Sequence, residues 1–232
     1  VTVAKATPWP QTVLNVKDLG ADPTGQGDST PALRQALEQA KDGGVVFLPR
    51  GRYQVTDGLE LPPRTVLRGE GREVTCLFWP DTPKPPEALI RGSHSFAVED
   101  LTLYASNHVN VIAADQTTPE AGNVFLRRLR VRADMYRGHL KPEEVNERFV
   151  TALRSSTGGG DTVRLGGRNV VVTDCDLYGS GRALYLSGVR GGLIASNTFY
   201  NGRWGWYCLS GSDGLVFERN AIVGADLMAT GG

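Results

Sequence analysis

Three six-residue segments decide the fold: Val172-Thr173-Asp174-Cys175-Asp176-Leu177, Ile194-Ala195-Ser196-Asn197-Thr198-Phe199 and Phe217-Glu218-Arg219-Asn220-Ala221-Ile222. Each begins and ends on an apolar residue, and they start at residues 172, 194 and 217, so the period is 22 and then 23 residues. Two earlier segments, at 98–103 and 126–131, repeat the pattern at wider spacing, which leaves room for inserted loops. A period of this length indicates a solenoid with one coil per repeat.

A second set of short segments recurs with nearly the same period as the first. Val163-Arg164-Leu165, Leu184-Tyr185-Leu186 and Tyr207-Cys208-Leu209 each precede one of the three segments and alternate as a strand does. Three strands and their turns fill the repeat, which leaves no room for a helix in each coil. The sequence therefore predicts a right-handed parallel β-helix over residues 14–232, after an N-terminal extension or linker at 1–13. A β-sandwich, the alternative, gives no reason for the period.

Two asparagines hold the same place in successive coils. Inward-pointing amides of Asn197 and Asn220 can stack and bond the turn backbone of neighbouring coils. Cys175, Leu129 and Leu101 occupy this place in earlier coils, so we expect apolar contacts there.

One helix is predicted, at about residues 31–41. Asp28, Ser29 and Thr30 offer capping oxygens, Pro31 suits the first turn, and the apolar residues that follow recur at helical spacing. We expect this helix to cap the first coil. At the other end no capping segment follows residue 224, so we expect a longer chain or a second chain to complete the solenoid.

Composition excludes several classes of protein. Lys plus Arg and Asp plus Glu number 25 each, so no overall field attracts nucleic acid. No apolar run approaches the length of a membrane span, and residues 1–10 show no signal peptide. The three cysteines lack disulfide or zinc spacing, and we expect no metal or other cofactor, apart from a calcium ion that a lyase could assemble from separate coils. The arginines at 127, 128, 130 and 132 form a basic stripe, which is typical of a solvated face.

The first 70 residues carry a family resemblance. The stretch Leu14-Asn15-Val16-Lys17-Asp18-Leu19-Gly20-Ala21-Asp22, with Gly27-Asp28-Ser29-Thr30, Gly43-Gly44-Val45-Val46-Phe47-Leu48-Pro49, Gly51-Arg52-Tyr53 and Val66-Leu67-Arg68-Gly69-Glu70-Gly71, resembles the start of the pectate-lyase-like β-helix superfamily. That superfamily includes polygalacturonase-related hydrolases and tailspike depolymerases. The resemblance implies a carbohydrate groove along one face and a secreted, periplasmic or cell-surface protein acting on a polysaccharide.

The sequence also departs from the polygalacturonase pattern. Those enzymes carry an Asn-Thr-Asp, an Asp-Asp pair, a Gly-His-Gly and an Arg-Ile-Lys on successive coils. Here single aspartates, Asp161 and Asp226, stand at comparable corners, and His139 falls in a loop inserted at about 135–160. Simple polygalacturonase activity is therefore not expected.

One face of the predicted solenoid suits an acidic glycan. If Val163 and Leu184 point inward, their neighbours point outward, and the expected binding residues are Arg164, Tyr185, Trp206, Trp204, Arg182, Arg203 and His139. Aromatic rings suit the C–H faces of sugars, and guanidinium groups suit carboxylates or sulfates. An ordinary amphipathic solvent face is the alternative reading of the same residues.

Three aspartates are candidate catalytic groups. Hydrolysis of a glycoside normally needs two carboxyl groups, and Asp161, Asp226 and Asp134 lie at coil corners near this face. The first hypothesis is a glycoside hydrolase. The alternatives are a polysaccharide lyase, in which Arg164 or Arg182 removes the proton beside a uronate carboxylate, and a non-catalytic glycan-binding or spike-like structural module.

Overall fold

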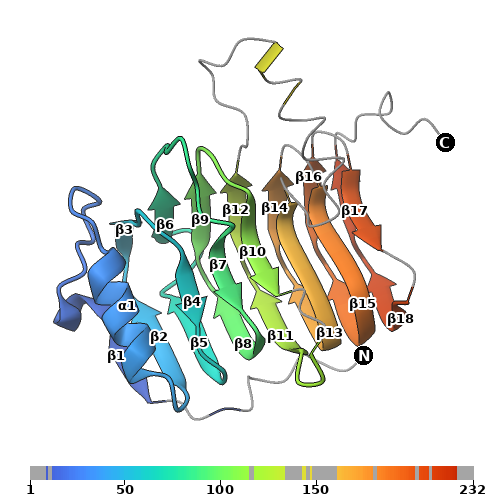
Figure 1. The fold of residues 1–232 in the computed structure, drawn as a ribbon, viewed down its shortest axis with the longest axis horizontal. Coiled ribbons are helices and arrows are strands. Elements are labelled where there is room, and N and C mark those ends of the chain that lie inside the picture. Colours follow the sequence, from blue (N-terminus) through green and yellow to red (C-terminus); the bar gives the residue numbers. More distant parts are fainter. Residues whose placement is uncertain are drawn as a thin grey trace.

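A computed structural model describes residues 9, 12–114, 118–133, 143–144, 147, 161–179, 182–201, 204–208 and 211–223, except for the side chains of residues 201 and 204–207. Parallel strands stack in successive coils from the N-terminal to the C-terminal end of this part (Figure 1). They form three faces, called faces A, B and C. This arrangement confirms the predicted parallel β-helix. No helix among the described residues is long and apolar enough to cross a membrane.

Each face takes one strand, or part of a strand, from each coil. Face A contains β4 (Leu59–Leu61), β7 (Ala88–Gly92), β10 (Asn110–Ala114), the first halves of β13 (Asp161–Thr173) and β15 (Arg182–Ala195), and β17 (Trp204–Cys208). Face B contains β1 (Val13–Asn15), β2 (Gly44–Leu48), β5 (Thr65–Gly69), β8 (His94–Glu99), β11 (Gly122–Arg127), the second halves of β13 and β15, and β18 (Asp213–Glu218). Face C contains β3 (Gly51–Gln54), β6 (Thr75–Trp79), β9 (Thr102–Ala105), β12 (Arg130–Ala133), β14 (Asp176–Gly179), β16 (Thr198–Asn201) and β19 (Ala221–Val223).

The corner between faces B and C is a short bend that every later coil repeats. One residue adopts the left-handed backbone conformation at each bend, with φ between 50° and 60°, at Asp100, Arg128, Asp174, Ser196 and Arg219. This conformation is uncommon outside glycine and turns the chain sharply. The next residue in each coil is the one that the sequence pattern places toward the core.

The predicted asparagine stack forms at this corner. The Asn197 amide nitrogen donates to Asn220 Oδ1 at 3.0 Å and to the Val172 carbonyl oxygen at 2.8 Å. Asn197 Oδ1 accepts from the backbone N–H of Cys175 at 3.0 Å, and the Asn220 amide nitrogen donates to the Ile194 carbonyl oxygen at 2.7 Å. The amides therefore join three successive coils, as predicted, while earlier coils have buried Cys175, Leu129 and Leu101 at this place.

The helix α1 (Thr30–Gln39) lies at the N-terminal end of the stack, beside β1 and β2 (Figure 1). It begins one residue before the predicted start and ends two residues before the predicted end. Asp28 Oδ1 accepts from the Thr30 backbone N–H at 2.9 Å, as expected of a capping oxygen. Leu33, Ala36 and Leu37 are buried in the core, so the helix covers the first coil. A short 3-10 helix, η1 (Val16–Leu19), precedes it.

The N-terminal segment also contacts the solenoid. The ring of Trp9 meets that of Phe125 edge to face, with centroids 5.4 Å apart, on an apolar cluster at the outer surface of face B. Strand β1 begins at Val13 and pairs with β2. The inserted loop predicted at 135–160 lies almost wholly outside the described residues, as does the end of the chain after residue 223.

Candidate functional site

An ionic cluster lies where the chain enters face A. Asp161 opens β13, and its neighbour in the next coil is Arg182, which opens β15. Arg182 Nε donates to Asp161 Oδ1 at 2.5 Å, and Arg182 Nη2 donates to Oδ2 at 3.1 Å. Arg164 Nη1 also donates to Oδ2, at 3.1 Å. Two predicted binding residues thus converge on one predicted catalytic residue.

Tyr185 lies against both arginines. The Arg164 guanidinium carbon is 4.1 Å from the centre of the Tyr185 ring, and that of Arg182 is 4.5 Å away. Arg164 and Tyr185 are direct neighbours in the ladder, so their side chains share one side of face A. A guanidinium that stacks on a ring while it donates to a carboxylate is fixed in position and stays charged.

The cluster is buried. Asp161 is fully buried, and the side chains of Arg164 and Arg182 are 7% and 10% exposed. Burial raises the pKa of the Asp161 carboxyl, while the charges and hydrogen bonds of Arg182 and Arg164 act to lower it. Arg164 and Tyr185, two of the expected binding residues, are each 6% exposed, and their binding roles stay predictions.

The backbone register of β17 differs from the alignment of face A that the sequence predicted. The backbone register pairs Leu184 with Trp206 and Tyr185 with Tyr207. In the backbone register Trp206 is thus aligned with the core position Leu184, and Tyr207 is aligned with Tyr185, where Trp206 was expected. The reason is the corner between faces A and B. The register pairs residues 165, 186 and 208 at one side of it and residues 172, 194 and 217 at the other, so the corner lengthens by one residue in each coil.

Several predicted site residues lie outside the described part of the chain. These are Asp134, His139, Arg203 and Asp226. Only the backbone of β17 is described at Trp204 and Trp206, and it places Trp204 next to Arg182 in the ladder. Their roles stay predictions.

Asn110 is a site residue that sequence reasoning missed. It opens β10 and is the direct neighbour of Asp161 in the coil before it. It is 2% exposed, and its Nδ2 donates to the Glu87 carbonyl oxygen at 3.1 Å, but among the described residues its Oδ1 has no hydrogen-bond partner. A buried acceptor without a donor costs free energy of folding. Asn110 Oδ1 is therefore a candidate to accept a hydrogen bond from a substrate hydroxyl. The sequence signal that could have found Asn110 is a polar residue placed just before an apolar run, here at 111–112. This run comes before the wide spacing that interrupts the regular repeat, so it was not aligned with the later coils.

A hollow of about 500 Å³ opens at the corner between faces A and B. Arg168 and Arg190, which are neighbours in β13 and β15, line it together with small residues of the corner turns. Arg168 Nη2 donates to the Pro119 carbonyl oxygen at 3.1 Å. Within the described ranges, no three His, Cys, Asp or Glu side chains gather closely enough to hold a metal ion.

The three-faced parallel β-helix has the architecture of a pectate-lyase-like solenoid. The chain belongs to the family described as rhamnogalacturonase A/epimerase, pectate lyase-like, whose model matches residues 13–225. This family is carbohydrate-active, and the match confirms the resemblance seen at the N-terminus.

Named relatives match the chain over different lengths. Mannuronan C5-epimerase AlgE5 of Azotobacter vinelandii is 24% identical over 231 residues, which cover 90% of this chain and 21% of that protein. Alginate lyase 7 of the same organism is 31% identical over 104 residues, or 38% of this chain and 12% of that protein. The chain thus spans about a fifth or less of the length of these relatives.

Solved structures show the same fold at low identity. The A-module of Azotobacter vinelandii mannuronan C-5 epimerase AlgE4 superposes with a TM-score of 0.55 at 19% identity, covering 87% of this chain and 59% of that one. The catalytic unit of a GH87 α-1,3-glucanase from Streptomyces thermodiastaticus gives a TM-score of 0.56 at 21% identity, covering 95% and 37%. At such identity the likeness concerns the fold alone.

Proposed function

We propose that this chain is part of an enzyme that acts on the uronate residues of an acidic polysaccharide by removing the proton at C5, the carbon beside the carboxylate. The observation that carries the proposal is the convergence of Arg164, Arg182 and Tyr185 around Asp161 on face A. The relative that covers 90% of the chain, named a mannuronan C5-epimerase, supports the same chemistry.

The reaction needs groups that stabilise negative charge. When the C5 proton leaves, its electron pair spreads into the substrate carboxylate, which gains a second negative charge. Fixed guanidinium groups stabilise such a charge without reorganising. Return of a proton to the opposite side of C5 gives the epimer. Loss of the glycosidic oxygen from C4, with a proton supplied to that oxygen, instead breaks the chain and leaves an unsaturated sugar.

The cluster divides these roles among its members. Because both guanidinium groups donate to Asp161, we assign Arg164 and Arg182 to charge stabilisation instead of proton removal. The Tyr185 hydroxyl, on the ring that both arginines contact, is assigned to carry the proton. The side chains of Arg164 and Arg182 are 7% and 10% exposed, so only a small part of each guanidinium is open to a substrate carboxylate.

The test measures three products from one set of reactions. Polymannuronate and other polyuronates are incubated in D₂O, and deuterium at C5, ultraviolet absorbance from unsaturated ends and new reducing ends are measured. We expect deuterium or absorbance, and a loss of about 100-fold in Arg182→Lys, which keeps the charge but loses the two-point contact with Asp161. Arg190→Lys, an exposed position on the same strand, is the matched control. Full activity in Arg182→Lys contradicts the assignment.

Glycoside hydrolysis is the second candidate function. The family description itself includes a rhamnogalacturonase, and Asp161 supplies one carboxyl group whose pKa burial raises. A second carboxyl group is needed, and the predicted partners Asp134 and Asp226 lie outside the described residues. New reducing ends without deuterium at C5 and without ultraviolet absorbance favour this candidate. Since the proposed substrates are extracellular polymers, we also propose a secreted, periplasmic or cell-surface location, which fractionation of the source cells tests.

A further inference from the structure

The outer surface of face C carries an aromatic row that runs along the solenoid. Phe78, Tyr104, Arg132, Tyr178 and Tyr200 are consecutive neighbours in the ladder, one from each of five coils. Tyr104 is 46% exposed and Tyr178 is 39% exposed. Large exposed rings in a line are uncommon on a protein surface and mark a binding surface.

The backbone fixes the direction of these rings. Residues just before them in each strand are buried in the core: Leu77, Leu103, Val131, Leu177 and Phe199. Because side chains alternate along a strand, the row must point outward. Tyr104 and Tyr178 are two strands apart, or about 10 Å. This separation is comparable to the length of a disaccharide unit in an extended chain.

Two arginines stack on rings of the row. The Arg132 guanidinium carbon is 5.3 Å from the centre of the Tyr200 ring and 5.9 Å from that of Tyr178, and that of Arg52 is 4.2 Å from the Phe78 ring. Arg132 also donates to the Val131 carbonyl oxygen at 3.2 Å. Within the described part of the chain, neither arginine forms an ion pair.

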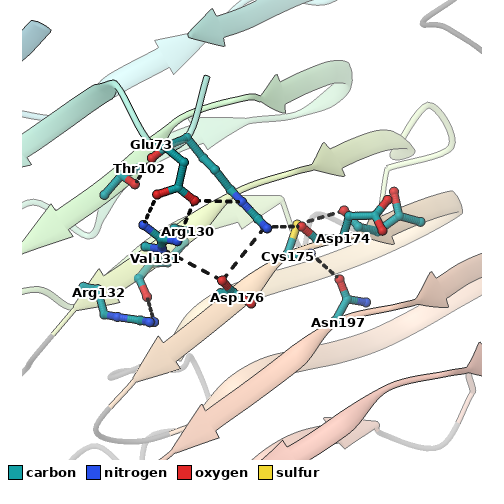
Figure 2. Close-up of polar contacts among 11 residues, drawn as sticks. Glu73, Thr102, Arg130, Val131, Arg132, Asp174, Cys175, Asp176 and Asn197 are labelled. Atoms are coloured by element: carbon teal, nitrogen blue, oxygen red, sulfur yellow. Dashed lines mark hydrogen bonds and ion pairs between the residues drawn. The ribbon is translucent and has the colours of Figure 1, made fainter. Parts of the chain in front are cut away.

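Arg130, two residues before Arg132 in the same strand, does form ion pairs. Arg130 donates to both carboxylate oxygens of Glu73 at 2.7 Å and lies 3.9 Å from Asp176 (Figure 2). In the same view the only contact drawn for Arg132 leads to the backbone of Val131. Carboxylates thus neutralise Arg130, whereas Arg132, two residues later in the same strand, presents positive charge within the row.

We propose that the aromatic row is a second polysaccharide-binding surface, separate from face A, which holds an extended acidic glycan without reacting with it. Tyr104 and Tyr178 would lie under alternate sugar rings, and Arg132 and Arg52 would take the carboxylate or sulfate groups. A second copy of the chain fits this surface less well, because a two-fold contact would bring the same arginines together.

Binding measurements test the row directly. Affinity for polyuronate oligosaccharides and for a neutral glucan is measured by calorimetry at low temperature in an Asp161→Asn background, and the oligosaccharides are checked for cleavage and C5 exchange after each titration so that binding is read without turnover. We expect the double variant Tyr104→Ala/Tyr178→Ala to lose about tenfold in polyuronate affinity. The matched control Tyr104→Phe/Tyr178→Phe keeps the rings and should bind as the parent does. Arg132→Gln should weaken polyuronate binding and its salt dependence while sparing the neutral glucan.

Three results would overturn the proposal. The first is parental affinity in the double alanine variant, and the second is an equal loss in the alanine and phenylalanine variants. The third is a change of oligomeric state in sedimentation with no change in glycan affinity, which would assign the row to a second copy. If the double variant does not fold, Tyr104→Thr, which suits a strand, replaces it. Failure of the C5 chemistry on face A leaves these measurements unaffected, since binding is read without turnover.

Discussion

Asn197→Ala is the sharpest test of what holds the coils together. Asn197 is 1% exposed, and its amide serves the backbone of the preceding coil by accepting from Cys175 N–H and donating to the Val172 carbonyl. It also donates to Asn220 Oδ1 in the next coil. The alanine variant leaves two buried backbone groups without partners and breaks the amide stack at its centre.

The magnitude follows from these contacts. A buried backbone group that loses its partner costs about 1–3 kcal/mol, so the two together cost about 2–6 kcal/mol of the free energy of unfolding. Asn220 adds little, because it is only half-buried and water can replace the lost contact. This cost is a large fraction of the stability of an ordinary domain.

Urea unfolding followed by circular dichroism measures this difference. The control is Arg34→Ala, which removes an exposed ion pair with Asp57 of 2.7 Å and should cost about 0.2–1 kcal/mol. The reasoning fails if Asn197→Ala unfolds within 0.5 kcal/mol, roughly the value expected of the control, because the stack would then contribute no more than a surface contact.

Three further predictions concern the N-terminal end of the molecule and the ionic cluster around Asp161. Hydrogen bonds from Thr24 and Gly27 lower the pKa of Asp22 from 3.8 to about 2, so its stabilisation is present above pH 3.8 and is lost as pH falls toward 2; acid titration of Asp22→Asn should show a smaller loss than the parent. Trp9→Ala should lower the free energy of unfolding by about 1–2 kcal/mol in urea, since the ring leaves Phe125. Removing one partner of a buried ion pair costs about 3–5 kcal/mol, so Asp161→Ala should unfold at markedly lower urea than Asp161→Asn, which keeps an acceptor oxygen.

The coils could be predicted because the signal that defines them repeats. From the bend between β8 and β9 onward, each bend between faces B and C is equally long, so the residue placed toward the core recurs at a fixed offset, from Leu101 to Asn220. The corner between faces A and B varies in length, and there the sequence misplaced Trp206 by one residue. Because side chains alternate along a strand, an error of one residue exchanges the inward and outward rows.

The candidate site was less accessible to prediction for a different reason. The sequence named Asp161, Arg164, Arg182 and Tyr185, but it gave no means of knowing that one carboxylate would hold both arginines. It also passed over Asn110, because the feature that marks it, a buried amide oxygen with no partner in the described part of the chain, is visible only in three dimensions.

A binding surface on a solenoid is formed by residues from successive coils and not by residues close together in the sequence. Phe78, Tyr104, Tyr178 and Tyr200 are far apart in the sequence, and each taken alone is an ordinary outward residue of a strand. Stacking at one strand per coil turns them into a line at a regular spacing, which a glycan with its own regular repeat can follow. The sequence assigned Arg132 to a solvated basic stripe. Only the structure shows that Arg132 stacks on the tyrosine rings of neighbouring coils. On this chain the two proposals use different faces of one solenoid, the buried ionic cluster of face A for chemistry and the exposed rings of face C for binding.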